Sequence, residues 1–204
     1  MSDVTTVLRR ITAARPAPSA EERCDMCAAA IAEPHQHVVD VRNRSMMCTC
    51  RPCYLLFTDD GADLAYRSVP DRYLAFGDFR MSPGRWDELA IPVGIAFFFM
   101  HSTLDHVVAF YPSPAGATES ELPLDAWTGV VEANPGLATA RPDVEAILLR
   151  KMTDDVACYL VPVDCCYELV GHLRRLWRGF DGGADVHRRL DEFFADVQRR
   201  ARPA

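Results

Sequence analysis

The chain has 204 residues, 49% of them hydrophobic, which is enough to bury a core in one or two domains. Its formal net charge of −7 argues against nonspecific nucleic-acid binding, which needs a surplus of Lys and Arg. Neither a signal-peptide pattern nor an apolar run of about 20 residues occurs in the sequence. We therefore expect no nucleic-acid partner, no membrane span and a cytoplasmic location.

The first segment, residues 1–21, is predicted to contain a helix and a linker. Apolar residues recur at helical spacing from Val4 to Ile11, which predicts an amphipathic helix over residues 3–14. The Pro-containing stretch at 15–20 then indicates a linker.

Residues 22–60, the finger segment, carry the strongest chemical signal. Two C-x-x-C motifs are separated by twenty-two residues, and each such turn points two sulfurs at one place. Two turns at the ends of a hairpin complete a tetrahedral shell of thiolates. We therefore predict that Zn²⁺ binds to Cys24, Cys27, Cys50 and Cys53. The alternative is a set of buried structural thiols, but paired C-x-x-C turns at this separation are a specific signal for a metal. In a reducing compartment, clustered cysteines also favour a metal over a disulfide.

Three more soft ligands, His35, His37 and Cys48, lie inside the same segment. Side chains alternate along a strand, so Cys48 shares a face with Cys50 and either replaces it or lies just outside the shell. His35 and His37 also share a face in an extended chain. One of them is an additional or substitute ligand, or both are surface or outer-shell histidines. A binuclear site would need a bridging thiolate, because seven ligands are one short of two tetrahedral shells.

The sequence allows two metals, zinc and iron, and two shapes of the finger segment. Thiolates bind zinc and iron alike, but a rubredoxin-type iron site prefers Gly and aromatic residues beside its turns, where this chain has Ala28 and Tyr54. Zinc is therefore favoured over iron. Strands are predicted at 37–41 and 45–48. If residues 54–57 are helical, the segment is a treble-clef-like finger, and if they are extended, it is a zinc ribbon.

Residues 61–204 are predicted to form an α+β domain. Ser82 is predicted to cap a short helix that places Trp86 and Leu89 on one face. An internal repeat follows at an offset of fifty residues, in which Pro92, Ala96, Thr103, Asp105 and Pro112 match Pro142, Ala146, Thr153, Asp155 and Pro162. Each copy has a strand, a Thr-x-Asp turn, a second strand and then a helix, at 125–133 or 164–178. Although five identities can arise by chance, the pattern predicts duplicated β-β-α units in an antiparallel sheet with helices packed on one face. A last helix is expected at 185–200.

Other reactive residues have simpler interpretations. Cys158 is expected to be a small core residue. Cys165 begins a predicted helix, where a lowered pKa would favour a nucleophile, but the only nearby histidine is His172. His101 and His106 flank a hairpin turn and are interpreted as solvated. Residues 112–122 are rich in hydroxyls and are interpreted as a surface loop.

Several stretches resemble a known family. They are the first C-x-x-C motif with the His35-x-His37 pair, CTCRPCYLLF at 48–57, VPDRY at 69–73, IPVGIAFFF at 91–99, AFYPSPAGATES at 109–120 and YLVPVD at 159–164. With these stretches the chain resembles, over about residues 22–195, an uncharacterised family of actinobacterial proteins of unknown function. The genes of that family often lie beside those of uptake nickel–iron (NiFe) hydrogenases. The resemblance implies an accessory role and supplies no catalytic residues.

The resulting prediction is a zinc-binding accessory or protein-interaction factor that assists assembly or maturation of a NiFe hydrogenase. Its partners would be hydrogenase subunits or maturation factors, and the metal would stabilise the finger segment rather than perform catalysis. One alternative is a rubredoxin-like iron electron carrier, which would be coloured. The other is a thiol- or zinc-dependent enzyme that uses Cys165 or an open metal position.

Overall fold

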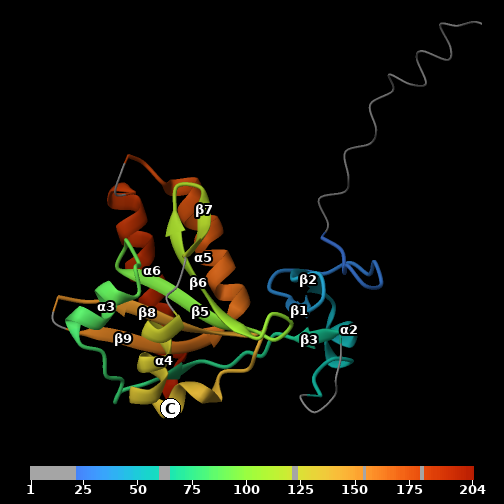
Figure 1. Cartoon of the computed structure of the whole chain (residues 1–204). Coiled ribbons are helices and arrows are strands. Elements are labelled where there is room, and N and C mark those ends of the chain that lie inside the picture. The colour runs from blue at the N-terminus through green and yellow to red at the C-terminus, as the bar shows by residue number, and fades with distance from the viewer. Residues whose placement is uncertain (1–21, 60–64, 121–123, 154, 180–181) are drawn as a thin grey trace, which may run out of the picture.

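The computed structural model describes residues 22–59, 65–120, 124–153, 155–179 and 182–204. The predicted helix at 3–14 and the linker at 15–20 lie outside these residues. The described chain forms a three-stranded sheet followed by a seven-stranded sheet, with helices beside them (Figure 1). The prediction of an α+β fold built on antiparallel sheets is therefore confirmed.

The three-stranded sheet has the order β2-β1-β3 and consists of β1 (Gln36–Asp40), β2 (Ser45–Thr49) and β3 (Tyr66–Ser68). Its β1–β2 hairpin is the predicted one. At the turn the Asp40 carboxylate accepts hydrogen bonds from the backbone N–H and the side-chain amide of Asn43, at 2.9 and 2.8 Å. Strand β3 was not predicted, and its pairing with β1 extends this sheet beyond residue 60. The division of the chain into 22–60 and 61–204 stays a prediction.

The seven-stranded sheet has the order β10-β4-β9-β8-β5-β6-β7. Its strands are β4 (Leu74–Ala75), β5 (Ile95–His101), β6 (His106–Ser113), β7 (Gly116–Ser120), β8 (Glu145–Lys151), β9 (Val156–Pro162) and β10 (Arg202–Pro203). The two predicted hairpins are β5–β6 and β8–β9, and they join through the antiparallel pairing of β5 with β8. Neighbouring strands are antiparallel except β10 and β4, which are parallel.

Helices cover both faces of this sheet (Figure 1). They are α3 (Pro83–Glu88), α4 (Leu124–Ala133), α5 (Val163–Leu176) and α6 (Gly183–Arg200), with a 3-10 helix, η1 (Pro135–Thr139), after α4. Residues of α5 and α6 pack on one face with Phe97 and Phe99. Residues of α3 and α4 pack on the other face with Phe98 and Leu149.

The prediction that helices pack on one face only is therefore wrong. Residues 95–99 of β5 and 145–149 of β8 are buried without interruption, so both faces of these central strands are covered. A strand buried on both faces carries a continuous apolar run instead of an alternating pattern. The run from Phe97 to Phe99 is such a signal. None of the helices that the structure describes is both long and apolar enough to cross a membrane.

The segment interpreted as a surface loop, residues 112–122, contains strand β7. Strand β6 continues to Ser113 and pairs there with Gly116, whose φ of +117° is a conformation that glycine tolerates. The Ser113 hydroxyl accepts hydrogen bonds from the Ala115 N–H and the Thr118 hydroxyl, which stabilise the tight turn. The loop prediction is therefore wrong for residues 112–113, which belong to β6, and for residues 116–120, which form β7. Only the short connection between β6 and β7 in this segment is a turn.

Candidate metal centre

The two C-x-x-C turns bring four sulfurs together. The Sγ atoms of Cys24, Cys27, Cys50 and Cys53 all lie within 4.8 Å of one another, and those of Cys27 and Cys50 are 3.6 Å apart. All four residues are free thiols. In a tetrahedral site with Zn–S bonds of about 2.3 Å, neighbouring sulfurs are about 3.8 Å apart. The observed separations therefore fit a single metal ion after a small contraction.

Local backbone structure orients each turn. In the first turn the Ala28 N–H donates to the Cys24 carbonyl at 2.8 Å, and Ala28 adopts the left-handed conformation with φ of +59°. In the second turn Cys50 is the N-cap of α2 (Arg51–Leu55), and the Tyr54 N–H donates to its carbonyl at 3.0 Å. Positions three apart lie on the same side of a helix, so Cys50 and Cys53 point in one direction.

Asp25 connects the first C-x-x-C turn to strand β2 through two hydrogen bonds. Its backbone N–H donates to the Cys48 carbonyl at 2.9 Å, and its carboxylate accepts from the Cys48 N–H at 2.7 Å. Because β2 leads directly into the second turn, these two hydrogen bonds hold the two C-x-x-C turns side by side. These two hydrogen bonds, one to a carbonyl and one to the Asp25 carboxylate, contribute to the meeting of the four sulfurs.

The four thiols differ in how readily they lose a proton. Burial opposes ionisation of Cys24, but the N–H groups of Cys50, Cys27 and Met26 hydrogen-bond to it, and its pKa falls to about 6. The neighbouring Cys50 side chain and burial together raise the pKa of Cys53 to about 12. Metal ligation requires thiolates, so binding of a cation here would release protons.

The four cysteine sulfurs restrict which metal ions this group could hold and what such an ion could do. Four thiolates in a tetrahedral arrangement suit Zn²⁺ and also iron, so the sulfurs alone do not identify the metal. An ion held by all four sulfurs has no open position for water or substrate. The arrangement therefore favours a structural or electron-transfer centre over a hydrolytic one.

His35, His37 and Cys48 form a group of their own. Their ligand atoms lie within 4.8 Å of one another, whereas the four-sulfur group contains Cys50 and not Cys48. Strand β2 ends at Thr49 and Cys50 is already the N-cap of a helix, so the strand alternation that would align Cys48 with Cys50 does not continue.

Three carboxylates around this second group were not singled out from the sequence. Glu22 and Glu33 lie 3.6 and 3.8 Å from Nδ1 of His35, and Asp164 lies 2.8 Å from Nδ1 of His37. The hydrogen bond to Asp164 raises the pKa of His37. Burial, followed by the nearby carboxylates, raises the pKa of Cys48 to about 11. In the sequence, Glu22 and Glu33 lie near the first C-x-x-C turn, which only weakly indicates that they surround the histidines. Asp164 is far from this segment in the sequence, so nothing there indicates its contact with His37.

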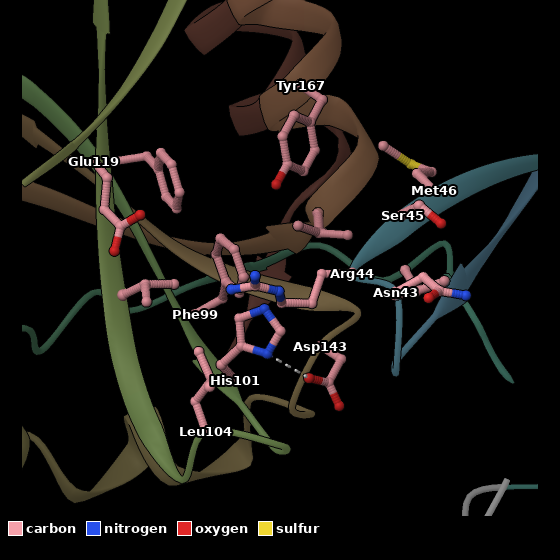
Figure 2. A pocket seen from close by; sticks show the side chains of 14 residues that line it. Asn43, Arg44, Ser45, Met46, Phe99, His101, Leu104, Glu119, Asp143 and Tyr167 are labelled. Atoms are coloured by element: carbon pink, nitrogen blue, oxygen red, sulfur yellow. Dashed lines mark ion pairs between the residues drawn. The ribbon is translucent and has the colours of Figure 1, made fainter. Parts of the chain in front are cut away.

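A cavity of about 520 Å³ lies between the β1–β2 hairpin and the seven-stranded sheet (Figure 2). Its wall includes His101, whose Nδ1 is 3.6 Å from Asp143, and the Tyr167 side chain of α5. His101 flanks the hairpin turn as predicted, at the end of β5, but its interpretation as solvated is wrong because its side chain is buried. Burial lowers the pKa of His101.

The remaining cysteines lie in the larger core. Cys158 is buried on β9, as predicted, and burial raises its pKa. Cys165 lies largely buried in the first turn of α5. His172 lies two turns further along α5, where its Nδ1 is 3.2 Å from Arg189. Within α5, the same Nδ1 atom is 3.9 Å from the Glu168 carboxylate.

Comparison with known proteins identifies a family. No curated protein and no solved structure matches the chain. One family model matches residues 23–201, a range that contains both C-x-x-C turns and strands β1 to β9. Since this match covers most of the sequence, the chain belongs to DUF5947, a family of unknown function.

Proposed function

We propose that this chain is a zinc-binding accessory protein whose finger segment docks onto a protein partner during assembly of a metalloenzyme. The observation that carries the proposal is the meeting of four cysteine sulfurs within 4.8 Å. A structural zinc ion contributes about 10–16 kcal/mol in small zinc-binding peptides, so its binding free energy becomes folding free energy. A short segment stabilised in this way presents a rigid surface.

The docking surface proposed is the end of helix α2. Leu55 and Leu56 lie two and three residues after Cys53 and are 51% and 69% exposed. Exposed apolar side chains held together on a rigid element are typical of protein contact sites. Because Cys53 is a proposed zinc ligand, the metal would fix the orientation of both leucines. A partner would therefore recognise the metal-bound form.

The partner that we propose is a subunit or maturation factor of a NiFe hydrogenase, which is the association that the sequence resemblance implies. The order of turn, hairpin and turn on a helix supports a treble-clef-like finger over a zinc ribbon, because α2 begins at Arg51. The free thiols fit a reducing compartment such as the cytoplasm.

The test is affinity capture from the native organism with the full chain as bait. We expect hydrogenase subunits or maturation factors to be enriched on the wild type and lost on Leu56→Asp. Met152→Asp is the matched control, because Met152 is also an exposed apolar residue, 50% exposed, but lies outside the finger segment. Capture of no metalloenzyme component by the wild type would overturn the proposed partner.

The iron electron carrier is distinguished by colour. A four-thiolate iron site absorbs visible light, whereas zinc has a filled d shell and no redox chemistry. Protein purified without oxygen is expected to be colourless, with a metal content dominated by zinc. A coloured protein with stoichiometric iron would replace the docking proposal with electron transfer.

A further inference from the structure

We propose that His35, His37 and Cys48 bind a second zinc ion, separate from the four-cysteine centre, with its fourth position open to a neighbouring cavity. This site goes beyond the docking role and does not depend on it. Its ligand atoms lie within 4.8 Å of one another. Two imidazoles and one thiolate form a donor set that suits Zn²⁺.

The β1–β2 hairpin brings these residues together. His37 on β1 is the register partner of Cys48 on β2, and directly opposite residues of an antiparallel pair have Cβ atoms about 4.5–5.5 Å apart. His35 lies two positions before His37, and their ring centroids are 4.8 Å apart. The hairpin and the residue that leads into it therefore supply all three ligands.

The ring nitrogens of His35 are the second observation that points to a cation. Its side chain is only 7% exposed, and both ring nitrogens are buried without a hydrogen-bond partner. Leaving a buried polar atom unpaired costs about 1–3 kcal/mol. The carboxylates of Glu22 and Glu33, at 3.6 and 3.8 Å from Nδ1, are too distant for hydrogen bonds. A metal ion at Nε2 would satisfy one nitrogen and draw a carboxylate toward the other.

His37 already has the arrangement that is typical of a metal-bound histidine. Its Nδ1 is 2.8 Å from the Asp164 carboxylate, which fixes the ring and makes Nε2 the nitrogen that would bind a metal. Metal-binding histidines nearly always donate their second nitrogen to a carboxylate or carbonyl in this way. The negative charge of Glu22, Glu33 and Asp164 also favours a cation at this place.

The three ligands line a cavity of about 830 Å³ together with Tyr73, Cys165 and other residues of α5 and the C-terminal segment. Zinc sites with three protein ligands keep water or another exchangeable ligand in the fourth position. The second ion would therefore differ in chemistry from the first, because it can exchange a ligand from the cavity. The ligand class is a small molecule or anion with a nitrogen, oxygen or sulfur donor.

The first test counts metal ions in the full chain after loading with Zn²⁺ and removal of excess. We expect about two zinc ions per chain in the wild type, and about one in His35→Gln and in Cys48→Ser. His187→Gln is the matched control, because His187 is exposed on α6, and it should retain both ions. About one ion in the wild type with no loss in His35→Gln would overturn the second site.

The second test needs no variant, so misfolding does not obscure it. X-ray absorption of the zinc-loaded wild type should show an average shell of sulfur and histidine nitrogen. A shell of sulfur alone would contradict the second site and leave the four-cysteine centre and the docking proposal standing.

Discussion

Nδ1 of His37 and Oδ2 of Asp164 are 2.8 Å apart, although 127 residues separate them in the sequence. His37 belongs to β1 of the small sheet, and Asp164 lies in the first turn of α5 beside the large sheet. Arg67 adds an ion pair between the same two parts, with Nη1 3.3 Å from Asp143. The position of the three-stranded sheet on the seven-stranded sheet therefore depends partly on ionised pairs.

Asp164→Asn is expected to lower the free energy of unfolding by about 1–2 kcal/mol, because the charged hydrogen bond to His37 is weakened in a half-buried place. Chemical denaturation measures this, and amide exchange of β1 should accelerate. Asp191→Asn is the control. Asp191 pairs with Arg150 while 68% exposed, and such surface pairs contribute about 0–1 kcal/mol. Equal losses in the two variants would contradict a special role for Asp164.

Metal removal is expected to unfold the finger segment and leave the seven-stranded sheet intact. The described part of the segment has few buried apolar side chains, among them Val38 and Val41, whereas the sheet carries a cluster on each face. After treatment with a strong chelator, hydrogen exchange should rise at residues 24–57 and stay slow in β8 and β9. Restored protection on adding Zn²⁺ is the control. Unchanged exchange at residues 24–57 would show that the segment folds without metal.

The part of the site that was predictable is the part set by local geometry. A C-x-x-C turn fixes the direction of its own two sulfurs, so the four-cysteine group follows from the motif spacing. The partner of His37 was not predictable, because Asp164 reaches it only through the packing of α5 on the sheet. The burial of His101 likewise depends on where β5 ends, which periodicity does not define.

In the fold, too, the features set by local sequence could be predicted, and those set by long-range packing could not. The paired hairpins and four of the helices could be predicted, since apolar periodicity and turn residues are local signals. The placement of helices on both faces was missed, although the run from Phe97 to Phe99 indicates burial on both sides. Strands β4 and β10 have two residues each, and so short a segment carries no periodicity.

Arg72→Ala is expected to destabilise the protein by about 3–5 kcal/mol, because it leaves a buried carboxylate without its cation. The Glu145 side chain is fully buried, and the Arg72 Nε and Nη2 atoms donate to it at 2.7 and 2.6 Å. Thermal or chemical denaturation measures the loss. Arg188→Ala is the control, because Arg188 pairs with Asp185 on the surface and should cost about 0–1 kcal/mol. A loss below about 1 kcal/mol for Arg72→Ala would mean that Glu145 is satisfied by other groups.

His101 is expected to make stability fall as the pH drops below the ordinary histidine value of 6.5. Burial lowers the pKa of the folded imidazole, so between the folded and unfolded values the unfolded chain binds more protons. Stability then rises with pH across this window, and the contribution is complete above it. In His101→Gln the residue stays neutral, and the slope of unfolding free energy against pH in this window should decrease. Denaturant titrations at several pH values compare the slopes, and an unchanged slope in the variant would assign the acid sensitivity to other groups.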